Sequence, residues 1–130
     1  MTDKRQFIYV CSPLRGDTEA NIKRAKVYSR KIFESGFCPI APPIYFPQFL
    51  QDDILQEREA GMQMGISLLS NCSAIVICGN ELTNGMRLEL EEALKHRLPV
   101  YSIHAFLDAA EQHAQSEKRN KKHSKGGPEL

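Results

Sequence analysis

The sequence predicts an α/β protein, a Rossmann- or flavodoxin-like three-layer sandwich built on a four- to five-stranded parallel sheet. Short apolar runs alternate with longer helical patterns along the chain, and the apolar runs are continuous, as expected for strands that are buried on both faces. Strands that alternate with helices form parallel sheets covered on both sides. With 130 residues, of which 42% are hydrophobic, the chain can bury such a core without disulfides or a metal.

The first strand and the first helix follow each other directly. Residues 7–11 read FIYVC, a short apolar run, and the turn-forming segment 12–16 ends it. Asp17 or Thr18 can cap the following helix, because their side chains accept hydrogen bonds from its first free amides. We expect this helix to end at Gly36, since glycine readily adopts the left-handed conformation found after helices.

The next segment contains a short strand, a proline-rich loop and a long helix. The run 37–41 (FCPIA) predicts the second strand, and the prolines at positions 42, 43 and 47 predict a loop. A helical pattern then extends from about residue 53 to residue 70. The apolar residues expected on its buried face are Leu55, Met62, Ile66 and Leu69.

The remaining elements repeat the alternation. The run 73–78 (SAIVIC) predicts the third strand, and a helix is expected to begin near Asn84 and Gly85. The run 99–103 (PVYSI) predicts a fourth strand, and residues 106–115 predict a last helix.

Beyond residue 115 the composition changes. We predict one α/β domain over residues 1–115 and a basic, disordered tail over residues 116–130, which could contact phosphate-rich partners. The basic residues of the tail are Lys118, Arg119, Lys121, Lys122 and Lys125.

Composition argues against several classes of function. The formal net charge of +1 gives no overall attraction to nucleic acid or membranes. No apolar run approaches the roughly 18 residues of a membrane span, and the first residues lack the features of a secretory signal, so we expect a cytoplasmic protein. The four cysteines form no C-x-x-C pair, and the histidines from His96 onward have no ligand-like spacing. We therefore expect buried thiols, no metal and no cofactor.

Two loops carry residues that could bind a ligand beyond the carboxyl ends of the strands, where open α/β sheets place their sites. In the first loop, Ser12 lies beside Arg15, whose guanidinium can bind phosphate or carboxylate, and Gly16 lets the backbone approach a ligand. The second loop, residues 79–85, leads into a helix N-terminus, where free amides favour an anion. Neither loop is a Walker A or G-x-G-x-x-G motif, which argues against a nucleoside triphosphatase or a nicotinamide dehydrogenase.

Each of these residues also has a structural alternative. Arg15 could pair only with Asp17 or cap a helix, and Gly85 could simply serve a turn. Glu89 lies about one helical turn after Gly85 and can point back toward the anion site. It could equally be a solvated helix carboxylate, since Glu91 and Glu92 are close by.

The segments YVCSPLRG at 9–16 and TNGMRLELEEA at 83–93 together resemble the nucleoside 2-deoxyribosyltransferase superfamily. The resemblance covers about residues 7–103. Within the superfamily the chain is more similar to the 2′-deoxynucleoside 5′-monophosphate N-glycosidase branch. It is most similar to a bacterial and phage group that shares S-P-x-R-G and G-M-x-x-E.

This resemblance implies roles for individual residues. Glu89 holds the place of the glutamate that attacks the anomeric carbon, and Tyr9 matches the tyrosine that orients this glutamate or the sugar. Arg15 and Gly16 match the loop near the 5′ end of the nucleotide. Thr83 stands where transferases on free nucleosides carry an aspartate and the hydrolases a serine, which favours a phosphorylated substrate. Phosphate would be bound by Arg15 and Thr83 and by the helix amides that follow.

One residue departs from the family pattern. The superfamily usually carries an aspartate on the helix before the third strand, which helps to protonate the base, and Gly65 stands there in this chain. Loss of this acid could mean slow chemistry, a different leaving group or no turnover. The acids that could replace it are Asp52, Asp53, Glu57 and Glu59.

Two functions follow as expectations. The first is an enzyme that cleaves the N-glycosidic bond of a (deoxy)nucleoside 5′-monophosphate, as an N-glycosidase or a deoxyribosyltransferase. The second is a non-catalytic nucleotide sensor that uses the same pocket. Nucleic-acid binding through the tail is disfavoured, because the body carries slightly more acid than base. The resemblance also implies a homodimer or a larger homo-oligomer, to which Tyr45, Phe46, Phe49, Met62 and Met64 could contribute a surface.

Overall fold

The computed structural model of the chain describes residues 4–125, and side chains over residues 4–120. Its centre is a four-stranded parallel sheet with the strand order β2-β1-β3-β4. The strands are β1 (Phe7–Cys11), β2 (Cys38–Ile40), β3 (Ala74–Ile77) and β4 (Val100–Ser102).

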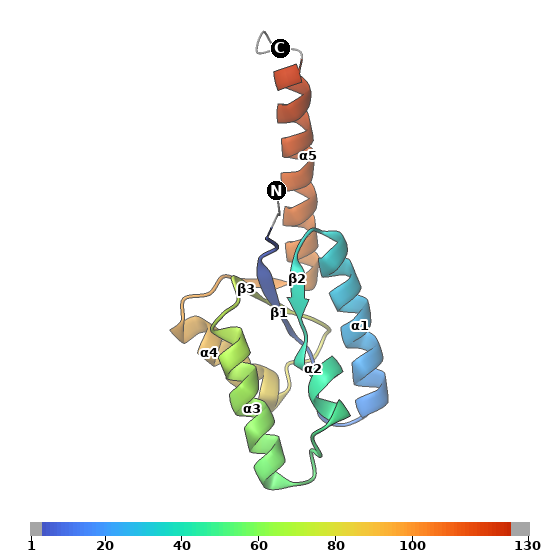
Figure 1. Cartoon of the computed structure of the whole chain (residues 1–130), viewed down its shortest axis with the longest axis vertical. Helices are drawn as coiled ribbons and strands as arrows, with labels where there is room; N and C mark the ends of the chain where they lie inside the picture. The colour runs from blue at the N-terminus through green and yellow to red at the C-terminus, as the bar shows by residue number, and fades with distance from the viewer. Residues whose placement is uncertain (1–3, 126–130) are drawn as a thin grey trace.

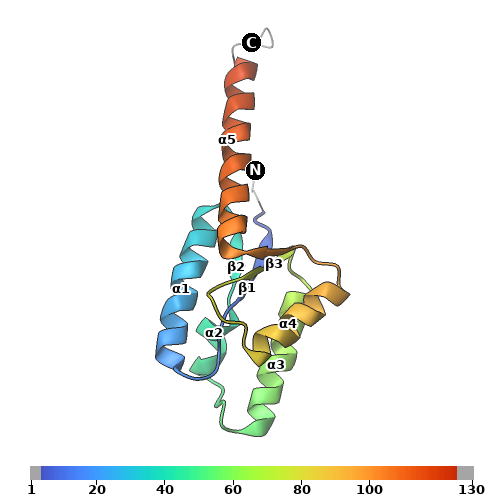
Figure 2. The ribbon, with the colours of Figure 1, turned by 180° about the vertical axis from the view of Figure 1, so that it is seen from behind.

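Helices cover both faces of this sheet (Figures 1 and 2). Helices α1 (Thr18–Glu34) and α5 (Ile103–Lys125) pack on one face, and α3 (Leu55–Leu69) and α4 (Asn84–Lys95) pack on the other. The three-layer α/β fold with a parallel sheet, predicted from the alternating patterns, is therefore confirmed.

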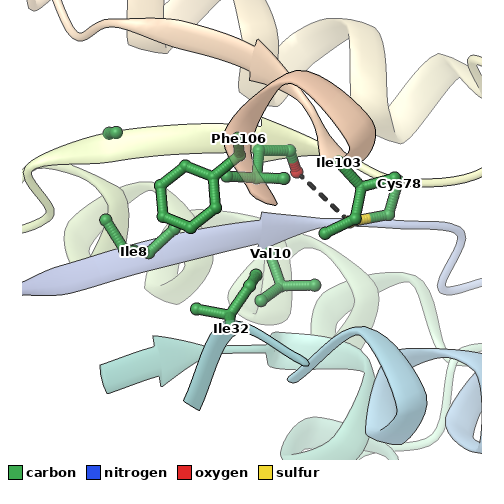
Figure 3. Packing of buried hydrophobic residues seen from close by; sticks show 8 residues of the cluster. Ile8, Val10, Ile32, Cys78, Ile103 and Phe106 are labelled. Carbon is green, nitrogen blue, oxygen red and sulfur yellow. Dashed lines mark hydrogen bonds between the residues drawn. The ribbon is translucent and has the colours of Figure 1, made fainter. Parts of the chain in front are cut away.

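Alternate residues of β1 serve the two faces of the sheet. Figure 3 shows Ile8 and Val10 packed with Ile32 of α1 and with Ile103 and Phe106 of α5. Consecutive strand residues point to opposite sides, so the residues between them face α3 and α4. The core on that side is formed by Tyr9, Cys11, Leu69, Cys72, Ile75, Met86 and Ala93.

The ends of the first helix follow the predicted signals. Asp17 caps α1, since its side chain accepts a hydrogen bond of 3.1 Å from the backbone amide of Ala20. Gly36 follows the helix with φ of +98°, a left-handed conformation that a residue with a Cβ rarely adopts.

The proline-rich segment was predicted as a loop but contains two short helical turns, α2 (Pro42–Tyr45) and the 3₁₀ helix η1 (Phe46–Gln48). Proline is compatible with the first positions of a helix, where its missing N–H would have had no partner. Phe46 is buried here, whereas Tyr45 and Phe49 are exposed.

The buried face predicted for α3 is wrong in part. Leu69 is buried, but Leu55 and Met62 are exposed and Ile66 is only partly buried. The residues of this helix that face the core are Gly61, Gly65 and Leu69.

The last helix is longer than predicted. α5 continues to Lys125, through a segment in which we expected no regular structure. Glutamate, glutamine, lysine and arginine favour helices, and His113 and Glu117 add an i,i+4 contact of 3.2 Å. The division into a domain and a basic tail stays a prediction, and residues 126–130 of that tail lie outside the described residues. The distal part of α5 extends away from the body of the molecule (Figure 1).

The cysteines lie largely inside. Cys11, Cys72 and Cys78 are buried, Cys38 is partly exposed, and none of the four is in a disulfide. Among the helices of the described part of the chain, none has the length and apolar character to cross a bilayer.

Candidate active site

A cavity of about 410 Å³ lies beyond the carboxyl ends of β1 and β3. The strand order reverses between these two strands, and open parallel sheets bind ligands at such a point. The volume falls in the range of small-molecule sites, roughly 300–1,000 Å³. The cavity brings together all eight site residues predicted from the sequence, which are Tyr9, Ser12, Arg15, Gly16, Thr83, Asn84, Gly85 and Glu89.

One carboxylate lies at the centre of this arrangement. Glu89, in the second turn of α4, accepts a hydrogen bond at Oε2 from the hydroxyl of Tyr9. Its Oε1 accepts a second one from the thiol of Cys11, with Sγ and Oε1 3.4 Å apart. Tyr9 and Cys11 are two residues apart on β1 and therefore point to the same side of the sheet. Glu89 is thus a fixed group of the cavity, and the alternative of a solvated helix carboxylate does not describe it.

The surroundings shift the ionisation of this group. Burial raises the pKa of Glu89 to about 7, although the hydrogen bonds from Tyr9 and Cys11 act in the opposite direction. Burial and the nearby Glu89 charge raise the pKa of Tyr9 far above its ordinary value, so the phenol stays a proton donor. Near neutral pH the site therefore holds a carboxylate that can be ionised beside a phenol that cannot.

The loop after β1 presents polar groups to the same cavity. The hydroxyl of Ser12 is buried and has no hydrogen-bond partner among the described residues. Arg15 forms an ion pair with Asp52, at 2.7 Å from Nε to Oδ2, and not with Asp17. Asn21, which sequence reasoning missed, is buried and supports the loop, because its Nδ2 donates to the Arg15 carbonyl at 2.9 Å.

The Arg15–Asp52 ion pair can be exchanged for a ligand. The two side chains are 63% and 42% exposed, and exposed ion pairs stabilise proteins by only about 0–1 kcal/mol. An incoming phosphate could replace the carboxylate of Asp52 at the guanidinium at small cost.

The start of α4 supplies the second anion-binding element. Thr83 is its N-cap, and its Oγ1 accepts a hydrogen bond of 3.2 Å from the amide of Met86. The Thr83 hydroxyl proton remains free to be donated. Asn84 and Gly85 occupy the first turn, where backbone amides have no intrahelical acceptor. The positive end of the helix dipole adds to the attraction for an anion.

Gly65 lies directly against the central pair. A Cβ at this position would be 3.1 Å from the Tyr9 hydroxyl oxygen and 4.0 Å from Oε2 of Glu89. Helix α3 can therefore approach β1 and α4 closely only because residue 65 has no side chain. Of the four acids considered as replacements for the missing aspartate, only Asp52 lines this cavity, and it is paired with Arg15.

Arg58 also lines the cavity and was not identified from the sequence. It precedes Gly61 by three residues and Gly65 by seven, which places all three on one face of α3. The signal that could have found it is this glycine spacing. Hydrophobic periodicity does not reveal this face, because two of its three buried residues are glycines.

The expected oligomer surface stays a prediction. Tyr45, Phe49, Met62 and Met64 are exposed, whereas Phe46 is buried and lines the cavity. Across the described residues, no group of three or more His, Cys, Asp or Glu side chains is arranged to hold a metal ion.

Two comparisons relate the chain to known proteins, one through a family model and one through a solved structure. A family model described as a domain of unknown function (DUF7768) matches residues 6–103. No curated protein gives a significant match. Among solved structures, a 2-deoxyribosyltransferase from the psychrotolerant bacterium Bacillus psychrosaccharolyticus has a TM-score of 0.60 and 14% sequence identity, covering 74% of this chain and 70% of its own. At this identity the likeness shows a shared fold.

Proposed function

The chain belongs to the DUF7768 family of domains of unknown function, and we propose that it cleaves the N-glycosidic bond of a (deoxy)nucleoside 5′-monophosphate with Glu89 as the nucleophile. The observation that carries this proposal is the Glu89 carboxylate. It is held from both oxygens by Tyr9 and Cys11 in a cavity that also offers anion-binding groups.

The proposed chemistry begins at the anomeric carbon. An ionised Glu89 oxygen attacks C1′, and the C1′–N bond breaks through an oxocarbenium-like state that the carboxylate stabilises, while the base departs with the bonding electron pair. Water then attacks C1′ of the glycosyl ester, which releases the sugar phosphate and restores the carboxylate. In a transferase a second base would take the place of water. Tyr9 keeps the carboxylate oriented throughout, because its proton is not lost near neutral pH.

Phosphate recognition explains the other polar groups. Arg15 and the Thr83 hydroxyl, together with the amides of Asn84 and Gly85, would bind the 5′-phosphate, and Gly16 lets the loop backbone come close. The buried, unpartnered hydroxyl of Ser12 would gain a partner from the substrate. Binding the phosphate would orient the sugar for attack, so remote binding energy would assist the reaction.

The fold shared with a 2-deoxyribosyltransferase supports a reaction on nucleosides. We further propose that the protein works in the cytoplasm without a cofactor, and as a homodimer or a larger homo-oligomer. Neither nucleic acid nor a membrane is proposed as a partner.

A nucleotide sensor that uses the same pocket is the second candidate. The observation in its favour is Gly65, because a pocket without the usual acid could bind a nucleotide and leave its glycosidic bond intact. Binding alone would then be the function.

The test is release of free base from a panel of ribo- and deoxynucleoside 5′-monophosphates, separated by chromatography. We expect release by the wild type and a loss of at least about 10³-fold in Glu89→Gln, since the amide cannot act as a nucleophile. Glu91→Gln, an exposed acid on the same helix, is the matched control and should retain full activity. Binding of a nucleotide without release of any base would favour the sensor. Equal release by wild type and Glu89→Gln would exclude Glu89 as the nucleophile.

A further inference from the structure

A base that leaves C1′ usually needs a proton from an acid in the active site. A neutral purine or pyrimidine leaves C1′ with the bonding electron pair and becomes an anion unless a proton reaches it. Enzymes commonly provide this proton from a positioned acid, which contributes about 10²- to 10⁴-fold to the rate. The substrate class can therefore be read from the acids that the cavity offers.

The described residues that line the cavity include two carboxyl groups, Glu89 and Asp52. Glu89 is the nucleophile and must be ionised to act. Asp52 lies 2.7 Å from Arg15, at the end of the cavity assigned above to the 5′-phosphate, and so is not beside the base. Neither group is a positioned proton donor.

The other lining side chains do not replace them. Arg15 and Arg58 carry guanidinium groups, which donate hydrogen bonds but do not act as general acids. The phenol proton of Tyr9 is engaged by Glu89. Residue 65 has no side chain, and a Cβ there would already lie 3.1 Å from the Tyr9 hydroxyl oxygen, so no acid fits at this point without displacing Tyr9.

We infer that the substrate is a nucleoside 5′-monophosphate whose base carries a fixed positive charge, as in an N-ribosylpyridinium or an N7-alkylated purine. This inference rests on the glycosidase function proposed above and names its substrate class.

The reaction then balances without an acid. The Glu89 oxygen forms a bond to C1′, the C1′–N bond breaks, and its electron pair neutralises the cationic ring, which departs as a neutral molecule. One water molecule then attacks C1′, the ester bond to Glu89 breaks, and the water gives up one proton to solvent. The products are the neutral base, the sugar 5-phosphate and one proton.

The charges of the cavity suit such a substrate. A zwitterionic nucleotide carries a cation at the base and an anion at the phosphate. The partly buried Glu89 carboxylate would attract the cation, and Arg15 and Arg58 would attract the phosphate. Phe46 lines the same cavity and provides an aromatic ring, a group against which cations pack favourably.

A matched pair of substrates tests the inference. Guanosine 5′-monophosphate and its 7-methyl derivative share sugar, phosphate and ring system, and differ by one methyl group and its positive charge. We expect kcat/KM for base release at about pH 6, where the 7-methylguanine ring keeps its N1 proton and so its positive charge, to be at least about 10²-fold higher for the methylated compound, with Glu89→Gln as the background. The 2′-deoxy forms of both compounds and nicotinamide mononucleotide complete the panel, so that sugar and cation type are varied separately.

The outcomes separate this inference from the proposed function. Release from methylated and unmethylated guanosine nucleotides within about tenfold of each other would overturn the cationic-substrate inference and leave the glycosidase intact. Glu89-dependent release from nicotinamide mononucleotide but not from 7-methylguanosine nucleotides would assign the pyridinium class, and the reverse result the alkylated purines. No Glu89-dependent release from any neutral or cationic nucleotide would overturn the glycosidase itself and this inference with it.

Discussion

At the scale of single residues, the ionisation of Glu89 links the chemistry of the site to the stability of the fold. The folded protein holds this proton up to a pKa of about 7, whereas the ordinary pKa of glutamate is 4.5. Between these values the folded state binds more protons than the unfolded state, so the free energy of unfolding falls as the pH rises, and above about pH 7 it stays lowered. The full effect is on the order of 3 kcal/mol, at about 1.4 kcal/mol per pKa unit.

We therefore expect Glu89→Gln to stabilise the protein in a pH-dependent way. The glutamine carbonyl can still accept a hydrogen bond from Tyr9, but no buried charge forms. The free energy of unfolding, measured with urea, should exceed that of the wild type by about 1–3 kcal/mol at pH 8 and match it within about 1 kcal/mol at pH 4.5. Glu91→Gln should show no such dependence on pH. A variant less stable than the wild type at pH 8 would contradict the buried-charge explanation.

The same ionisation should give catalysis the opposite pH dependence. We expect kcat/KM for base release to rise about tenfold per pH unit below the Glu89 pKa and to level off above about pH 7.

The Cys11 thiol helps to lower the pKa of Glu89 through its hydrogen bond, so Cys11→Ala should move the rising limb of the pH profile to higher pH. Cys11→Ser, which retains a donor, should restore it. Superimposable profiles for wild type and Cys11→Ala would show that the thiol has no such effect.

At the scale of elements, α3 shows how glycines can shape a site. Gly61 and Gly65 lie on its inner face, one turn apart. A Cβ at Gly61 would be 3.3 Å from Cδ1 of Leu50, the end of a flexible side chain that can move aside. A Cβ at Gly65 would meet the Tyr9 hydroxyl, which Glu89 holds in place.

This difference predicts opposite results for two identical substitutions. Alanine in place of glycine inside a helix stabilises it by about 1 kcal/mol when nothing is in the way. We expect Gly61→Ala to be at least as stable as the wild type, and Gly65→Ala to be about 1–2 kcal/mol less stable than Gly61→Ala in urea denaturation. Equal stabilities of the two variants would show that the Tyr9 and Glu89 side chains can move away from the added Cβ at little cost in free energy.

The N-cap of α4 provides a further test at this scale. Removing a capping hydroxyl costs about 1 kcal/mol, so Thr83→Ala should lower the free energy of unfolding by that amount. Thr83→Ser keeps the acceptor for the Met86 amide and should be close to the wild type. Equal stabilities of the alanine and serine variants would indicate that the cap contributes little.

The sequence predicts these elements to different degrees for physical reasons. The strands are predictable because burial on both faces makes them continuous apolar runs, and α1 and α4 are predictable from Asp17 and from the turn at 83–85. The buried face of α3 is not predictable from hydrophobic periodicity, because Gly61 and Gly65 have no side chain to carry that signal. Arg58 was missed for the same reason. The loops after β1 and β3 can be placed from topology, whereas the choice of Tyr9 and the role of Glu89 depend on the family resemblance.

At the scale of the whole molecule, the body and the distal part of α5 contribute unequally to the hydrophobic core. Residues 103 and 106 at the start of α5 pack in the core, whereas every residue from 111 to 120 is exposed. The lack of structure predicted for residues 116–130 was based on composition. Composition indicates that a segment cannot build a hydrophobic core of its own, but it does not indicate whether the segment can extend a helix that is already anchored in a core.

Truncation after residue 116 should therefore spare the body. We expect the free energy of unfolding to change by less than about 0.5 kcal/mol, as is usual for surface changes, while the circular dichroism signal loses helix. Full-length protein and truncated protein should also elute with the same oligomeric state from size exclusion. A loss of several kcal/mol or a change in assembly would indicate that distal α5 packs against another copy of the chain.

The burial of the thiols gives the molecule a built-in reporter. Burial raises the pKa values of Cys72 and Cys78 to about 12 and also raises that of Cys11, and only a thiolate reacts with an alkylating reagent. In the folded molecule, Cys38 is the partly exposed member of the four. The number of modified cysteines seen by mass spectrometry should therefore rise from one to four when the molecule opens. The rate at which the three buried cysteines are alkylated then reports how often the molecule opens, without any label being added.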